Sequence, residues 1–117
     1  MTINIKGTEY DMATTLRVAY KVQGQHNHEP YSKVFEKIGD MTVEQQLGIL
    51  YCSFECANPE VAKQFTQIEF INYCLDNMNL KDMLDKLKEL VQGIMGTDGT
   101  EPSQEPTAGT ADEATPL

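Results

Sequence analysis

Two helix-start signatures of the same kind divide the middle of this sequence and restrict it to a mainly helical fold. Thr42 is followed by Gln45, and Thr66 by Glu69, so each pair can form a capping box in which the two residues exchange hydrogen bonds. After Thr42, apolar residues recur at helical spacing, at Val43, Leu47, Leu50, Tyr51 and Phe54, and the adjoining face carries Ile49, Cys52 and Cys56. A helix that is apolar over so much of its circumference is expected at the centre of the core.

Two further helices are predicted after Thr66. Phe65 and Phe70 have the spacing of a hydrophobic staple around the cap, and the helix that follows is lined by Ile68, Ile71 and Leu75. Asn79 is the expected cap of the last helix, with Met78 and Met83 at staple spacing. Its apolar stripe comprises Leu80, Met83, Leu84, Leu87, Leu90, Val91, Ile94 and Met95. Gly96 stands where a terminating glycine belongs.

Shorter elements are predicted before Thr42. Thr14 or Thr15 can cap a first helix that ends at Gly24 and places Leu16, Ala19, Tyr20 and Gln23 along one side. A polar loop over 25–30 leads to a short helix over 31–38, with Val34, Phe35 and Ile38 as its apolar residues and Gly39-Asp40 as its stop. Asn58-Pro59 ends the central helix and can start a short turn, because proline suits the first helical position.

Residues 1–12 have the pattern of a β-hairpin. Ile3 and Ile5 alternate with polar residues, and Lys6-Gly7 can form a two-residue turn because glycine adopts positive φ readily. This register pairs Ile3 with Tyr10, Ile5 with Thr8 and Met1 with Met12 on one face, and leaves Asn4 and Glu9 on the other. A lone hairpin is unstable in water, so its apolar face must pack on helices.

Composition changes sharply at Gly96. Residues 97–117, the acidic tail, contain five of the 18 acidic residues, no Lys or Arg, no aromatic residue and one large aliphatic residue, Leu117. Such a segment cannot bury enough apolar surface to offset its ordering entropy. We therefore expect a folded domain over 1–96 and a disordered tail over 97–117. The fold class is mainly α with a small N-terminal hairpin (α+β), with four to six helices around one core.

The charge balance excludes several kinds of partner. The net charge is -9 and no Lys/Arg cluster is present, so we expect no binding to nucleic acid. No apolar stretch approaches the roughly 20 residues of a membrane span, and the N-terminus lacks the pattern of a signal peptide. These features predict a protein of the cytoplasm without a membrane partner.

The three cysteines and two histidines are the candidates for chemistry. An odd number of cysteines in apolar contexts favours reduced, buried thiols over a disulfide framework. His26 and His28 lie in the polar loop, whereas Cys52 and Cys56 lie in an apolar helix, and this is not the spacing of a structural zinc site. No phosphate-binding glycine loop is present. We expect no catalytic, metal or cofactor site, although a thiol- or zinc-dependent enzyme is the third hypothesis.

The last predicted helix is the best candidate for a binding surface. Its apolar positions exceed the two per heptad of a narrow seam, so one edge can stay uncovered after the core is packed. Met83 and Met95 have flexible thioethers, which adapt to varied partner side chains. The candidate protein-binding residues are Leu80, Met83, Leu87, Val91 and Met95. The partner of this surface can be a helical client or a second copy of the chain.

The opening of the chain resembles a known family. Residues 3–12, INIKGTEYDM, followed at once by a helix beginning TTLRVAYKV, are similar to the start of the tail assembly chaperones of long-tailed bacteriophages and prophages. In that family a strand, a glycine turn and a second strand precede a helical body of about this size. The resemblance covers the layout of residues 1–95, and only the opening is motif-like.

The resemblance implies a non-catalytic protein of the infected host's cytoplasm. Such proteins bind the tape measure protein, keep it soluble, help recruit tail tube subunits and are absent from the mature virion. The alternative hypothesis is a small cytosolic adaptor or regulatory protein of a bacterium or mobile element.

Overall fold

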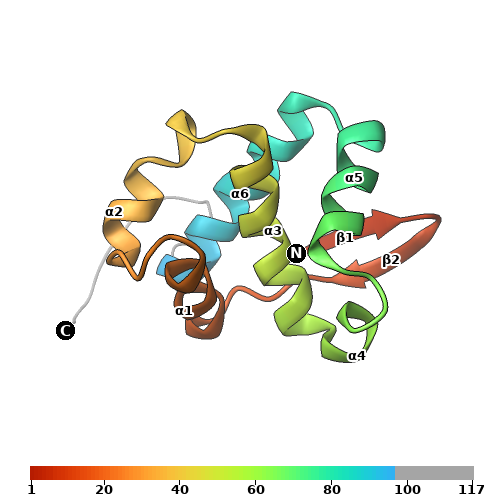
Figure 1. The fold of residues 1–117 in the computed structure, drawn as a ribbon, viewed down its shortest axis with the longest axis horizontal. Coiled ribbons are helices and arrows are strands. Elements are labelled where there is room, and N and C mark those ends of the chain that lie inside the picture. The colour runs from red at the N-terminus through yellow and green to blue at the C-terminus, as the bar shows by residue number, and fades with distance from the viewer. Residues whose placement is uncertain (97–117) are drawn as a thin grey trace.

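The computed structural model describes residues 1–96, which form six α-helices and a two-stranded antiparallel hairpin (Figure 1). The elements in chain order are β1 Thr2–Ile5, β2 Thr8–Asp11, α1 Leu16–Gln25, α2 Tyr31–Glu36, the 3₁₀ turn η1 Ile38–Asp40, α3 Val43–Ala57, α4 Pro59–Ala62, α5 Gln67–Asn77 and α6 Leu80–Met95. The predicted fold class is confirmed. The prediction for the acidic tail lies outside the described residues.

The hairpin has the register expected from the sequence. Ile3 pairs with Tyr10 and Ile5 with Thr8, and the turn places Lys6 at φ 55° and Gly7 at φ 86°. Positive φ at both turn residues matches the right-handed twist of the strands. The Lys6 backbone N–H donates to Tyr73 Oη on α5 over 2.8 Å, which anchors the tip of the hairpin to the helical body.

Helix α3 is the central helix, as its apolar circumference predicts. Its nine consecutive residues from Gln46 to Phe54 are all buried. The two polar side chains in this stretch have partners: Gln46 Nε2 donates to the Ile38 carbonyl over 2.8 Å, and Ser53 Oγ donates to the Ala13 carbonyl over 2.6 Å. Buried polar groups are tolerated when they are paired in this way. These bonds also fix the segments before α1 and before α3 against the central helix.

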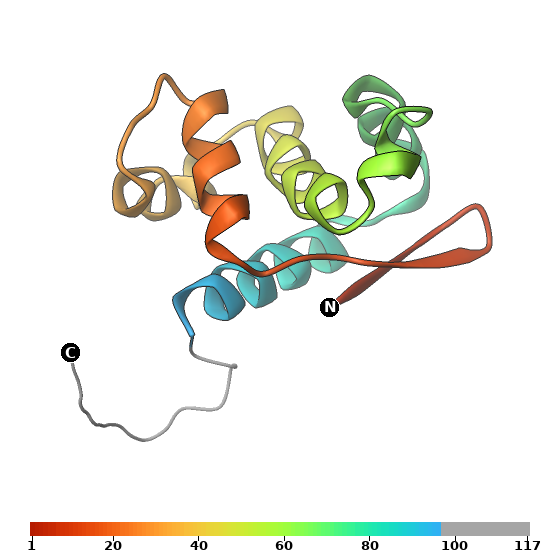
Figure 2. The ribbon, with the colours of Figure 1, turned by 90° about the horizontal axis from the view of Figure 1, so that it is seen from below.

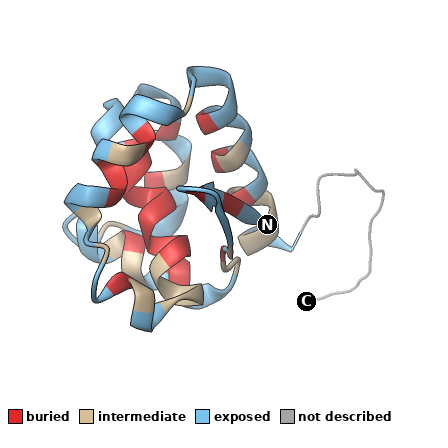
Figure 3. Cartoon of the chain, turned by 90° about the vertical axis from the view of Figure 1, so that its right-hand side faces the viewer, coloured by how far each residue is buried: buried red, intermediate tan, exposed pale blue. Residues whose placement is uncertain are grey.

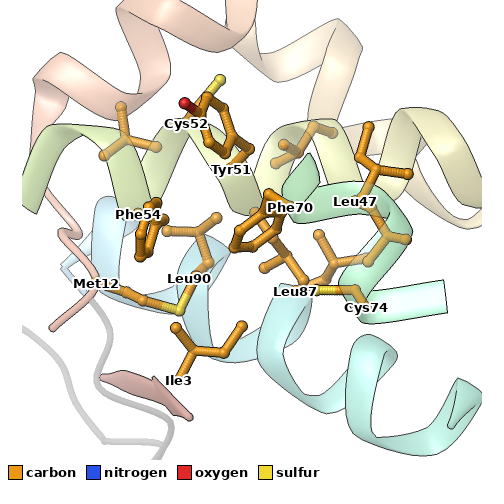
Figure 4. Packing of buried hydrophobic residues seen from close by; sticks show 14 of the residues in the cluster. Ile3, Met12, Leu47, Tyr51, Cys52, Phe54, Phe70, Cys74, Leu87 and Leu90 are labelled. Carbon is orange, nitrogen blue, oxygen red and sulfur yellow. The ribbon is translucent and has the colours of Figure 1, made fainter. Parts of the chain in front are cut away.

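An aromatic cluster joins α3 to α5. The rings of Phe54 and Phe70 have centroids 5.3 Å apart, and Phe65 lies edge-on to Phe70 at 6.2 Å, so the predicted staple is present. Figure 4 shows Phe54 and Phe70 beside Leu87 and Leu90 of α6, with Ile3 and Met12 below them. Buried residues therefore gather on the faces that the helices turn toward one another (Figure 3).

Five predictions about helix boundaries and caps are confirmed by geometry. Both capping boxes form, around Thr42 and Thr66. The Asp82 backbone N–H donates to Asn79 Oδ1 over 2.8 Å, and Gly96 ends α6 at φ 83°. Pro59 begins α4 directly after α3.

Two predicted helix faces are wrong in part. On α1 the buried residues are Val18, Ala19 and Val22, whereas Leu16 and Tyr20 are 79% and 68% exposed, and the helix continues past Gly24 to Gln25. On α5, Ile71 is buried with Phe70 and Cys74, but Ile68 and Leu75 are exposed. In each helix two apolar stripes overlap, and contact with α3 selects the stripe that is buried.

The short helix before α3 also differs from its prediction over 31–38. Helix α2 ends at Glu36, and Lys37 leads into η1, so Gly39 and Asp40 lie inside a 3₁₀ turn instead of stopping the α-helix. Val34 and Ile38 are buried, as expected. The break turns Phe35 and Ile38 toward α6, where they form one wall of a groove.

Candidate binding surface

Helix α6 is amphipathic and packs by one face only. It runs beneath α1 and α3 (Figure 2) and buries Met83, Leu87 and Leu90. Val91 and Ile94 are half-buried. The opposite face carries charged residues, among them Lys81 and Asp85, which form an exposed ion pair at 2.8 Å.

One edge between these two faces is apolar and largely uncovered. It consists of Leu80, Leu84, Val91 and Met95, the α6 edge, whose four positions share one side of the helix because they are four, seven and four residues apart. Leu80 is 61% exposed, Leu84 41% and Met95 56%. Large apolar side chains gathered on one edge, rather than scattered singly, are typical of an interaction surface.

The site residues predicted from the sequence fall into two groups. Leu80, Val91 and Met95 lie on the α6 edge. Met83 and Leu87 do not: they are only 3% and 2% exposed and belong to the core, so the prediction that they lie on an uncovered edge is wrong. Each still lines one of the two apolar hollows beside the edge, Met83 the one near the start of α6 and Leu87 the groove beside α2. Contact with α3 sets the rotation of α6, and the helical period alone does not reveal this rotation. Leu84, four residues after Leu80, is the exposed position that the prediction omitted.

The α6 edge borders a groove. The groove has a volume of about 310 Å³ and lies between α2–η1 and α6, with Phe35 and Ile38 on one wall and Leu84 and Val91 on the other. Lys88 stands at its rim. The sequence predicts Phe35 only as an apolar residue of the short helix over 31–38. Its position opposite α6 depends on the chain reversal at η1, which no local pattern predicts.

A second apolar hollow continues the surface toward the start of α6. It has a volume of about 180 Å³ and is lined by Val43 of α3, Leu75 of α5, and Met78 and Leu80 around the α6 cap. Leu80 lines this hollow and Leu84 lines the groove, so the α6 edge links the two depressions. Val43 and Leu75 were predicted to lie on buried helix faces. Both are exposed and form part of the apolar lining of this hollow.

The cysteines and histidines do not assemble a reactive centre in the described part of the chain. Burial raises the pKa of Cys52 to about 12 and the pKa of Cys74 to about 11, so both thiols are protonated at neutral pH and are poor nucleophiles. His26 lines a polar hollow with Gln25 and Glu44 near the start of α3, whereas Cys56 lines a different hollow near the end of α3. Within residues 1–96, no group of three or more His, Cys, Asp or Glu side chains is placed to hold a metal ion.

Comparison with known proteins adds no assignment: no family model, curated protein or solved structure matches this chain. Among the helices of residues 1–96, none combines the length and the apolar character needed to cross a bilayer. The structure thus defines a class, a mainly helical domain with an N-terminal hairpin, and its surface includes the apolar α6 edge with its two hollows.

Proposed function

We propose that this protein is a non-catalytic chaperone that holds an amphipathic helix of a client protein along the α6 edge. The observation that carries the proposal is the continuity of the edge with the groove beside α2 and the hollow beside α5. A client helix presents apolar side chains at positions i, i+3, i+4 and i+7, and such a row fits a groove flanked by helices. The client chemistry is therefore an apolar helical stripe.

The particular client follows from the resemblance of residues 3–12 to tail assembly chaperones. We propose the tape measure protein of a long-tailed bacteriophage, a long helical protein that aggregates when alone. The chaperone keeps this protein soluble in the infected bacterium's cytoplasm and helps to gather tail tube subunits around it. The net charge of -9 supports this role, because a strongly charged surface keeps a complex with an apolar client in solution.

The test is co-expression of the tape measure protein with variants of the α6 edge. Leu84→Ser and Met95→Ser remove apolar area from the edge without touching a buried side chain. We expect each variant to lower the yield of soluble tape measure protein at least threefold. Leu16→Ser and Tyr20→Ser are the controls, since both residues are large, apolar and even more exposed but lie on α1, and they should leave the yield unchanged.

All four variants are first shown to keep the wild-type melting temperature within a few degrees. If edge and control variants reduce client solubility equally, or if neither does, the α6 edge is not the client surface. If the wild-type protein leaves the tape measure protein insoluble, the client is another protein, and the adaptor hypothesis replaces the phage assignment.

A further inference from the structure

A cationic hollow lies on the side of the protein formed by α1, α3 and α4. It has a volume of about 510 Å³ and is lined by Arg17 and Lys21 of α1, Glu55 and Cys56 of α3, and Lys63 after α4. Three of the nine basic residues of an acidic protein therefore meet in one depression. This concentration sets the hollow apart from the α6 edge, which is apolar.

The positive charge of the hollow is only partly neutralised. Lys21 Nζ contacts Glu55 at 3.3 Å, and Lys63 Nζ contacts the outlying Glu60 at 3.3 Å. The second pair is largely exposed, and such pairs contribute little. Arg17 has no ion pair with a described carboxylate: its guanidinium lies over the Tyr20 ring, 5.6 Å from the centroid.

The remaining wall of the hollow carries no negative charge at neutral pH. Burial raises the pKa of the Cys56 thiol, so the thiol stays protonated. Beside the hollow, Leu16 and Tyr20 are exposed apolar side chains. The surface thus offers cations next to apolar groups, which suits an acidic peptide segment better than a small inorganic anion.

The chain itself supplies such a segment close by. Gly93 of α6 packs so tightly on Thr14 that a Cβ built on the glycine would be 2.7 Å from Thr14 Cβ. Thr14 is three residues before Arg17, so α6 ends beside the start of α1 (Figure 2), and the acidic tail follows α6 in the sequence. The tail carries Asp98, Glu101, Glu105, Asp112 and Glu113 and no basic residue.

The tail is also long enough to reach the hollow. Its 21 residues span up to about 70 Å when fully extended. The longest dimension of the protein is 42 Å. We propose that the acidic tail, residues 97–117, docks in the cationic hollow of its own chain through Arg17, Lys21 and Lys63.

The first experiment maps contacts in the full chain with a zero-length carbodiimide, which joins a lysine amine directly to a carboxylate. Lys21 and Lys63 report on the hollow, and the exposed Lys33 and Lys88 are matched controls. Lys88 is a stringent control because it lies closest to the tail in sequence. We expect Lys21 and Lys63 to form at least threefold more links to tail carboxylates than the controls at micromolar protein and low salt. The excess should vanish in 1 M salt, where the screening length falls to about 3 Å.

The second experiment changes only the tail. Replacing its five acids by their amides (Asp98→Asn, Glu101→Gln, Glu105→Gln, Asp112→Asn and Glu113→Gln) should shift the backbone amide resonances of Cys56 and Ala62 but not that of Cys74. The proposal would be overturned if the yield of cross-links simply increased with closeness to the tail in sequence, with Lys88 highest. It would also be overturned if the cross-links were spread evenly over all lysines. So would resonance shifts confined to Leu84 and Val91, which would place the tail on the α6 edge. Links that increase with protein concentration would assign the hollow to the tail of a second copy instead.

Discussion

Gly93 of α6 and Thr14, the residue two positions before α1, approach so closely that no side chain fits between them. A Cβ built on Gly93 would lie 2.7 Å from both Cβ and Cγ2 of Thr14. Glycine ordinarily weakens a helix interior, but here its missing side chain allows the end of α6 to pack on the segment that connects the hairpin to α1.

Gly93→Ala should therefore destabilise the protein by up to about 2 kcal/mol, because opening the overpacked contact costs about 1–3 kcal/mol and the gain in helix propensity offsets up to about 1 kcal/mol of this. Gly24→Ala is the matched control: it also lies in a helix, and no atom comes within 4 Å of the added Cβ. That variant should be stabilised by roughly 0.5–1 kcal/mol. Urea unfolding measures both. Equal effects at the two positions would show that the contact with Thr14 is not tight.

Leu50→Asp should abolish cooperative unfolding. Leu50 is fully buried in α3, and an unpaired buried carboxylate costs several kcal/mol, a large share of the roughly 5–15 kcal/mol that stabilises a domain. Leu16→Asp introduces the same side chain at a site that is 79% exposed and should unfold like the wild type. Circular dichroism during heating distinguishes the two. A folded Leu50→Asp protein with an unchanged melting temperature contradicts the assignment of α3 as the core helix.

Removing the hydroxyl of a helix-capping threonine should lower the stability only where that hydroxyl accepts a hydrogen bond. Thr42 Oγ1 accepts from the Gln45 backbone N–H at 3.1 Å, whereas Thr15 before α1 makes no side-chain cap bond. Thr42→Ala should lower the free energy of unfolding by about 1 kcal/mol, and Thr15→Ala by much less. Urea titrations of the two variants give the comparison. A larger loss at Thr15 would be inconsistent with the cap geometry.

Stability should fall in alkaline solution, with Cys52 contributing strongly. The pKa of its thiol is raised from 9.0 to about 12 in the folded state, so above pH 9 the unfolded chain releases a proton that the folded chain retains. The unfolded state is then favoured increasingly until pH 12, by about 2 kcal/mol from this group at pH 10.5. Cys52→Ala should lose less stability between pH 7.5 and 10.5 than the wild type under reducing conditions. Identical losses would refute a deeply buried thiol.

The features that were predictable from the sequence are those determined locally. The hairpin register follows from alternation around Lys6-Gly7, and the caps follow from residues three apart, such as Thr66 and Glu69. The exposed Leu16 and Ile68 could not be predicted, because each belongs to one of two overlapping apolar stripes. Contact with α3, which is distant in sequence, decides between the stripes.

The same reason limits what could be predicted of the binding surface. That α6 would keep an uncovered edge follows from the width of its apolar stripe, and Leu80 and Met95 are on that edge. The exact set of residues depends on the rotation of α6 against α3, which buries Met83 and Leu87. The wall of the groove opposite α6, which includes Phe35, depends on the turn at η1. The helical periodicity of the sequence does not predict this turn.

The attachment of the hairpin has a consequence for biosynthesis. Lys86 of α6 donates to the carbonyl of Thr2 over 2.9 Å, and the tip of the hairpin is held by Tyr73 of α5. The strands leave the ribosome before their anchoring partners on α5 and α6. A nascent chain that stops before α6 lacks the Lys86 contact, although Tyr73 of α5 can already hold the tip of the hairpin. During translation the hairpin is therefore anchored in two stages, first at its tip by α5 and then at Thr2 by α6.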